Sequence, residues 1–276
     1  MRVHSVVAIV TPDPEQLTDL IGFSRAFERR AVALDAWSPR ASISGMRVRM
    51  SFGLTGAALF SVIKEQLSRP GKIELYAQVP CTPPPMDTTP EGQLAHFADL
   101  RDPAEGPYLY IPATPAHNVA PLADVLSLVQ LYRVPLGMRV LHGPLRAGQE
   151  TARRTYCVRT DNILPAPEAS NYRATLHPST LDSMLDVELS ARGTTAYQAW
   201  LFGLGRQPYL RLLLAVDGEV MGTLNAISGD AGAMIHLQVI PNARLGSISP
   251  ELVGALWQSG PLNVQFVLSD EQAPIA

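Results

Sequence analysis

The sequence has few charged residues. Asp, Glu, Lys and Arg make up 17% of its 276 residues, whereas about 25% is typical of a soluble domain. Lysine is especially scarce, because only Lys64 and Lys72 are lysine among the 22 basic residues. A GC-rich genome explains arginine in place of lysine, but it does not explain a low total charge. A surface that is partly covered by neighbouring subunits explains the low total charge, because protein interfaces are depleted in Lys, Glu and Asp.

Cysteine is also scarce, occurring only as Cys81 and Cys157. Two cysteines are too few for a disulfide scaffold, and they lack the close spacing of a zinc site. We therefore expect a reducing interior, or indifference to redox state. The N-terminal apolar run that ends at Val10 is too short for a secretory signal and is followed by prolines. The location that we predict is a cytoplasmic assembly, with a virion or similar particle as one form that it takes in the end.

No stretch of the chain is suited to crossing a membrane as a helix. The longest uncharged candidate, Gly106–Ala123, contains four prolines, which exclude a spanning helix. The net charge of −3 argues against a protein that binds polyanions over its whole surface. We expect no membrane partner, and nucleic acid only at a local basic patch.

Recognisable catalytic motifs are missing as well. There is no Gly-x-Ser-x-Gly sequence to present a nucleophile. The six histidines are isolated from one another rather than paired as metal ligands. We predict no metal, no cofactor and no catalytic residue, and we favour a non-enzyme. An enzyme whose residues are scattered along the chain remains the alternative.

What the sequence does contain is a strong run of sheet-forming residues from Pro208 to Pro241. It predicts three strands, over 209–216, 219–227 and 233–240. Asp217-Gly218 between the first two is a two-residue connection that favours positive φ at both positions. The pattern predicts an antiparallel meander.

The rest of the chain predicts helices mixed with strands. Residues 1–80 form a β-α-β-α-β unit in which 14–32 and 57–67 are helices and 42–52 is a single half-buried strand with arginines on its open face. A proline-rich connector over 81–92 precedes a C-terminal domain over 93–276, although one continuous domain is also compatible. In that second part, 143–148 is expected to be a loop, 161–178 mostly irregular and 180–185 a short helical turn.

These elements predict an α+β fold. Its antiparallel or mixed sheets would be dominated by the C-terminal meander, with helices packed on one face. The alternative is a β-sandwich or jelly-roll with inserted helices. In the second half, Ser249-Pro250 is the clearest start of a helix, with serine as the cap and proline at the first helical position.

Two weak candidate sites stand out. The first is a basic tract with a modest positive excess, which could contact a phosphate backbone; its arginines are Arg139, Arg146, Arg153, Arg154 and Arg159. The second is a strand–loop–helix context in which amide groups could converge on an anion; its residues are Gly53, Thr55 and Gly56. The ordinary alternatives are a solvated loop and a tight turn.

Together these observations favour a structural subunit of a large homo-oligomeric assembly, such as a virion coat, tail or baseplate component. Its expected partners are copies of itself and other subunits of the particle. A nucleic-acid-binding subunit of a ribonucleoprotein or packaging complex is the second hypothesis. No motif of a known family is present to decide between them.

Overall fold

The computed structural model describes residues 2–10, 19–45, 47–54, 59–79, 110–112, 137–146, 149–177, 183–205, 211–225, 233–240, 249–262 and 264–267. Within them, helices and mostly antiparallel strands form two sheets, so the predicted α+β class is confirmed. The strands are β1 (Arg2–Val10), β2 (Trp37–Ser44), β3 (Arg47–Leu54), β4 (Ile73–Val79), β5 (Tyr110–Pro112), β6 (Met138–Arg146), β7 (Gln149–Pro165), β8 (Ala169–Leu176), β9 (Ser183–Leu189), β10 (Arg211–Val216), β11 (Glu219–Asn225), β12 (Met234–Val239) and β13 (Val264–Val267). The helices are α2 (Leu20–Ala33), α3 (Leu59–Ser68), α6 (Ala191–Leu204) and α7 (Pro250–Ser259).

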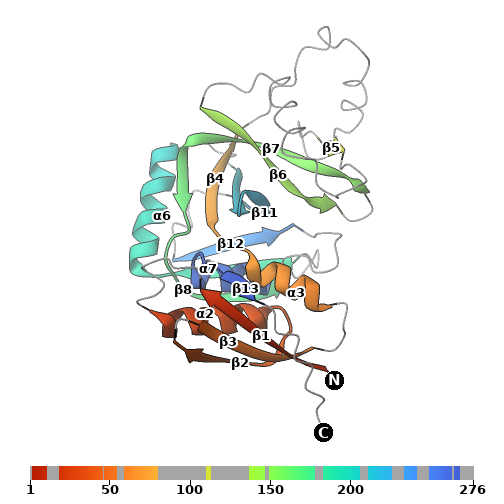
Figure 1. Cartoon of the computed structure of the whole chain (residues 1–276). Coiled ribbons are helices and arrows are strands. Elements are labelled where there is room, and N and C mark those ends of the chain that lie inside the picture. Colours follow the sequence, from red (N-terminus) through yellow and green to blue (C-terminus); the bar gives the residue numbers. More distant parts are fainter. Residues whose placement is uncertain are drawn as a thin grey trace.

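The smaller sheet has four antiparallel strands in the order β13-β1-β3-β2. The chain runs β1-α2-β2-β3-α3 and returns to this sheet only at β13. This order is that of a ferredoxin-like split β-α-β unit, into which the rest of the chain is inserted between α3 and β13. In Figure 1 β1, β2 and β3 lie at the lower end of the molecule, close to α2 and α3.

One face of the small sheet is covered by α2. Asp19 caps this helix, since its Oδ1 accepts a hydrogen bond from the Gly22 amide at 2.8 Å. The apolar stripe of α2 packs on Val48 and Met50 of β3. Arg47 and Arg49 alternate with these two residues and are exposed on the opposite face. The predicted open arginine face of β3 is therefore present. The core residues that the helices and strands share are Phe23, Ala26, Phe27, Ala31, Val48, Met50, Phe52, Ile63 and Leu67.

The larger sheet contains a closed ring of strands. Hydrogen bonding runs from β10 to β4, β7, β6 and β11, and β11 pairs back to β10. The one parallel step is β6–β11, where Glu219 pairs with His142. Five strands therefore form a small barrel whose interior is filled by side chains. The interior residues are Tyr76, Leu141, Tyr156, Val158, Leu213, Ala215 and Val220.

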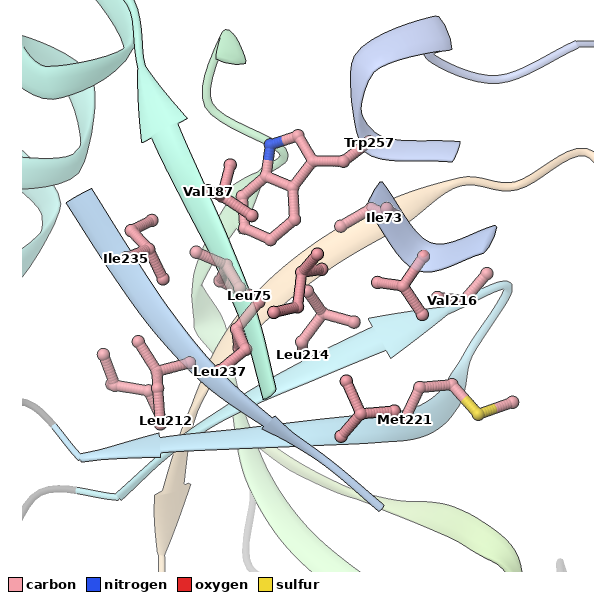
Figure 2. Close-up of a cluster of buried hydrophobic side chains, with 14 of the residues drawn as sticks. Ile73, Leu75, Val187, Leu212, Leu214, Val216, Met221, Ile235, Leu237 and Trp257 are labelled. Atoms are coloured by element: carbon pink, nitrogen blue, oxygen red, sulfur yellow. The ribbon is translucent and has the colours of Figure 1, made fainter. Parts of the chain in front are cut away.

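The main core lies outside this barrel. The larger sheet continues from β11 through β12 and β9 to β8, and α6 and α7 fill the space between this extension and the outer faces of β4 and β10. Figure 2 shows Trp257 of α7 gathered with Ile73, Leu214, Val187 and Leu237. The Trp257 Nε1–H donates to the Pro167 carbonyl at 2.8 Å, so this large side chain is both buried and hydrogen-bonded.

The predicted meander is confirmed by consecutive antiparallel pairing of β10, β11 and β12. Asp217 and Gly218 have φ values of 51° and 82°, as the two-residue turn requires. The helix start at Ser249-Pro250 is also confirmed, because the Ser249 side chain accepts from the Leu252 amide.

Four local predictions are wrong. The segment 42–52 is not one strand, because the chain reverses at Gly45 (φ +60°) between β2 and β3. The segment 143–148 is not all loop, since β6 continues to Arg146. The segment 161–178 is mostly regular, because β7 extends to Pro165 and β8 follows. Finally, β9 begins at Ser183, within the expected helical turn over 180–185.

The chain connects the small sheet to the large sheet through two segments, one before β4 and one before β13, and these segments lie side by side. The Leu262 amide donates to the Pro70 carbonyl at 2.8 Å, which joins the segment before β4 to the segment before β13. The buried Arg30 side chain of α2 contacts both: its guanidinium donates to the carbonyls of Arg69 (2.9 Å), Pro70 (3.0 Å) and Gly260 (2.6 Å), and to Ser259 Oγ (3.1 Å). We call this group of contacts the Arg30 clamp.

The predicted domain boundary stays a prediction, because the whole connector at 81–92 lies outside the described residues. Hydrogen bonding adds two facts that bear on it. β4, within the predicted N-terminal unit, pairs with β7 and β10 of the larger sheet. β13, near the C-terminus, pairs with β1.

Candidate interaction surfaces

The predicted basic tract lies on β6 and β7. The structure describes the side chains of two of its arginines, Arg139 and Arg159, and each lies close to a carboxylate. Arg159 forms two hydrogen bonds with the Asp161 carboxylate, at 2.9 and 2.6 Å, which raise the pKa of Arg159 and lower that of Asp161. The Arg139 guanidinium lies 4.7 Å from the ring centre of Tyr76 and 3.9 Å from Glu74 Oε2. These contacts leave both arginines less available to a phosphate.

The other three arginines of the tract lie on the β6–β7 pair. Arg146 pairs with Gln149, and Arg153 pairs with Leu145 and with Ile111 of β5. Arg154 pairs with Tyr110 of β5. Their side chains lie outside the described residues, so their part in nucleic-acid binding stays a prediction.

The predicted anion loop is described only at its first residue. Gly53 lies within β3, where it pairs with Val3 and Trp37. Thr55 and Gly56 lie outside the described residues, and α3 begins at Leu59. A strand that ends at Leu54 therefore precedes a helix as predicted, while the loop between them and its anion binding stay predictions.

The outer face of α6 is an exposed surface that the sequence did not single out. Phe202, in the last turn, is 90% exposed. The inner face is fixed in the main core by Tyr197 and by Trp200, whose Nε1–H donates to the Asn162 carbonyl at 3.3 Å. Arg192 is the one charged residue of the helix. We call the exposed residues Arg192, Thr195, Ala196, Ala199, Phe202 and Gly203 the α6 surface.

A second exposed surface is the face of β2 and β3 turned away from α2. Arg40, Arg47 and Arg49 are exposed there, together with Ser42 and Ser44. Neither strand contains Asp or Glu. We call this face, completed by the half-buried Ser51, the Arg–Ser face.

A cross-strand polar pair lies on the exposed side of β9 and β12. His236 Nδ1 is 2.7 Å from Asp186 Oδ1, and the two residues are directly opposite in the register. This contact is typical of cross-strand pairs that stabilise a sheet. Among the described residues, no group of three or more His, Cys, Asp and Glu is placed to hold a metal ion.

The strongest pKa shifts belong to residues inside the protein. Burial lowers the pKa of Arg30 to about 10, a shift that the carboxylate of Asp217 partly opposes. Asp217 itself accepts hydrogen bonds from the amides of Gly71 and Lys72. Burial raises the pKa of Tyr197 to about 12. These groups lie in the Arg30 clamp and the main core, where they have structural partners.

Cys157 bears on the expectation of a reducing interior or of indifference to redox state. It is buried on β7 and is disulfide-bonded. Disulfides persist mainly in oxidising compartments and on the surfaces of cells and virions. The cytoplasmic location therefore stays a prediction, and this bond weighs against it. Within the described residues no helix is long and apolar enough to cross a membrane.

The sequence matches no protein-family model and no curated protein. Among solved structures it is similar to SecDF in its super-membrane-facing form, with 13% identity and a TM-score of 0.49 over 97% of this chain and 30% of that one. A structure of SecDF as a membrane component that enhances protein export aligns at 14% identity and a TM-score of 0.46, over 96% and 98% of the two chains. SecDF from Thermus thermophilus, a translocon-associated membrane protein, aligns at 12% identity and a TM-score of 0.32, over 96% and 30%. The chain thus spans under a third of the first of these proteins, and likenesses this low carry no argument about its function.

Proposed function

We propose that this protein is a structural subunit that assembles with copies of itself through the α6 surface. The observation that supports this most directly is Phe202, which is 90% exposed on a helix with a single charged residue. Burying a phenylalanine side chain contributes about 1.5–3 kcal/mol. An exposed Phe202 side chain does not contribute this free energy to stability unless a partner covers it.

The α6 surface is complementary to itself. Arg192 and Phe202 lie at opposite ends of one helix face, ten positions apart. If two copies pair antiparallel about a two-fold axis centred near Tyr197, Arg192 of each copy lies opposite Phe202 of the other. A guanidinium over an aromatic face is an attractive contact. The two like charges then lie at opposite ends of the interface.

The middle of the surface suits close contact between helices. Thr195, Ala196 and Ala199 are small and exposed, and the distance between packed helices depends on the side chains at the contact. Helix α6 cannot rotate to hide Phe202, because Tyr197 and Trp200 hold its other face in the core. The finer proposal, a coat, tail or baseplate component of a virion, rests on the low charge of the whole chain and on these exposed surfaces.

Sedimentation-velocity ultracentrifugation tests the proposal. The wild-type chain is expected to sediment as a dimer or larger at micromolar concentration. Phe202→Asp removes two symmetry-related Phe contacts, which together contribute roughly 3–6 kcal/mol, so the dissociation constant should rise at least about 100-fold. Leu176→Gln is the matched control, because Leu176 is 63% exposed on β8, away from α6.

Two results would contradict the proposal. One is a wild-type protein that remains a 29.9 kDa monomer over the micromolar range. The other is an assembly that Leu176→Gln disrupts as strongly as Phe202→Asp does. The thermal melting temperature of each variant shows whether a loss of assembly reflects a loss of folding.

A further inference from the structure

Cys157 lies on the outer face of the barrel, at the step between β4 and β7. It pairs directly with Val79 of β4. Its neighbours Tyr156 and Val158 belong to the barrel interior, so the alternation of side chains along a strand places Cys157 on the outside. Cys157 is nevertheless only 8% exposed, and it is disulfide-bonded. Its half of the disulfide is therefore largely shielded from solvent.

The sequence leaves one partner for this bond within the chain. It contains two cysteines, and the second is Cys81. Cys81 lies outside the described residues, two positions after Val79, where β4 ends. Two residues of chain span at most about 7 Å, and the Cα atoms of a disulfide lie within roughly 7 Å of each other. Because Val79 is directly opposite Cys157, the chain is long enough for Cys81 to reach Cys157.

A disulfide between two copies of the protein fits the structure less well. The side chains that cover Cys157 leave little of it accessible, and a cysteine from a second copy would have to displace them. A cysteine that is buried in this way is also chemically inert. Its burial favours a permanent structural bond over a catalytic or regulatory thiol.

The end of β4, which lies beside β7 (Figure 1), is a place where a covalent bond has a large effect. The register of β4 with β7 shifts after Tyr76, and among the described residues only Gln78 and Val79 pair with β7 beyond this shift. The pairing of β4 with β10 already ends at Ala77. The last two residues of β4 are therefore held by hydrogen bonds on one side only, directly before the proline-rich connector.

We infer that a disulfide between Cys81 and Cys157 fastens the end of β4 to β7, and that the stability of the fold depends on it. The bond forms by thiol–disulfide exchange with an oxidised dithiol donor. The two cysteine thiols give up two protons and two electrons, and the disulfide of the donor is reduced to two thiols. Glutathione and thioredoxin keep such thiols reduced in the cytosol. A protein that depends on this bond matures in an oxidising compartment, which differs from the cytoplasmic location that its sequence predicts.

Mass spectrometry of the full-length protein, purified without reductant, tests the identity of the bond. N-ethylmaleimide in guanidinium chloride should add no label before reduction and two labels after it. Trypsin without reductant should release one species in which the peptide Ile73–Arg101 is joined to the peptide Thr155–Arg159. Electrophoresis in detergent without reductant should show a monomer, because detergent separates copies that are not covalently linked.

Thermal unfolding tests the contribution of the bond to stability. Reduction of the wild type should lower its melting temperature by about 5–15 °C, because the loss of a native disulfide raises the entropy of the unfolded chain. Cys81→Ser should melt at the temperature of the reduced wild type. Cys81→Ser/Cys157→Ala is the matched control, because reductant should not change the melting temperature of a chain without cysteine. The comparison of oxidised with reduced wild type needs no substitution, so it remains decisive if a variant does not fold.

Three outcomes overturn the inference. The first is a wild-type protein that takes up label before reduction, since its thiols would then be free. The second is a dimer in electrophoresis without reductant, with the peptide Thr155–Arg159 joined to a second copy of itself, which would place the bond between chains. The third is a wild-type melting temperature that reduction does not change, which would show that the bond does not stabilise the fold.

Discussion

Substitutions at Arg30 can distinguish the contribution of its charge to stability from the contribution of its hydrogen-bond geometry. Arg30 is fully buried, and burial lowers its pKa from 12.5 to about 10. That shift corresponds to a cost of about 3 kcal/mol for keeping the guanidinium charged inside the protein. Four hydrogen bonds from the charged group offset this cost.

Three substitutions at this position should differ in a defined order. Arg30→Met removes the burial cost along with the hydrogen bonds, so the free energy of unfolding should fall by only about 2 kcal/mol. Arg30→Lys keeps a buried charge but has three donors and no planar fork, so it should lose about 3 kcal/mol. Arg30→Ala also leaves a cavity and should lose about 4 kcal/mol or more.

Urea unfolding followed by tryptophan fluorescence measures these differences. Trp37 lies on the small sheet, and Trp200 and Trp257 lie in the main core, so the probe reports on both parts of the fold. Arg29→Ala is the control, because Arg29 is the exposed neighbour of Arg30 on α2. It should change stability by less than about 0.5 kcal/mol.

The pH dependence provides a second check. A folded-state pKa of about 10 means that Arg30 stays protonated in both states below pH 10. The difference in free energy of unfolding between the wild type and Arg30→Met should therefore be constant between pH 6 and pH 8. The reasoning is refuted if Arg30→Lys is as stable as the wild type, because the clamp would then depend on charge alone. It is also refuted if Arg30→Ala is as stable as Arg29→Ala.

Two further predictions concern the main core. Gly254→Ala should destabilise the protein by about 1–3 kcal/mol, because a Cβ there would clash with the Tyr172 ring; in a double-mutant cycle, Tyr172→Ala should recover part of that loss, and additive effects would exclude the contact. Because the folded-state pKa of Tyr197 is raised to about 12 by burial, the stability linked to its neutral form is complete below pH 10 and is lost as the pH rises through 12. Spectrophotometric titration at 295 nm should show one fewer late-ionising tyrosine in Tyr197→Phe than in the wild type, and a wild-type curve identical to that of Tyr197→Phe would contradict the assignment.

Local patterns in the sequence were sufficient for most helices and for the meander. Ser249-Pro250 and Asp217-Gly218 are short-range signals whose geometry depends on a few neighbouring residues, and both are formed as expected. The strand boundary at Gly45 was missed because the alternation of side chains continues across the turn. β8 was missed because Pro165 and Pro167 interrupt the sequence before it, and because its outer residues are polar.

The closed barrel could not be inferred from local patterns. Its closure depends on β10 pairing with β4, a segment more than 130 positions earlier in the chain. One signal was nevertheless present, because Leu212–Val216 is an unbroken apolar run, and such runs indicate strands buried on both faces.

The candidate surfaces depend on tertiary packing in the same way. The weak amphipathicity of the helix that carries Phe202 did not show which of its faces the core would cover. The arginines of β3 were expected on an open face. Their alignment with the serines of β2 became visible only once the hairpin register was known.

The adjacency of Pro70 and Leu262 has a consequence for the origin of the chain. Since the polypeptide leaves the split β-α-β unit and rejoins it at a single hydrogen-bonded point, the whole intervening segment could have been acquired in one genetic event without disturbing the host sheet. The same adjacency makes this point a natural junction for chimeras. A foreign domain whose own ends lie close together could be grafted between the two connecting segments while the arginine-bearing sheet is kept intact.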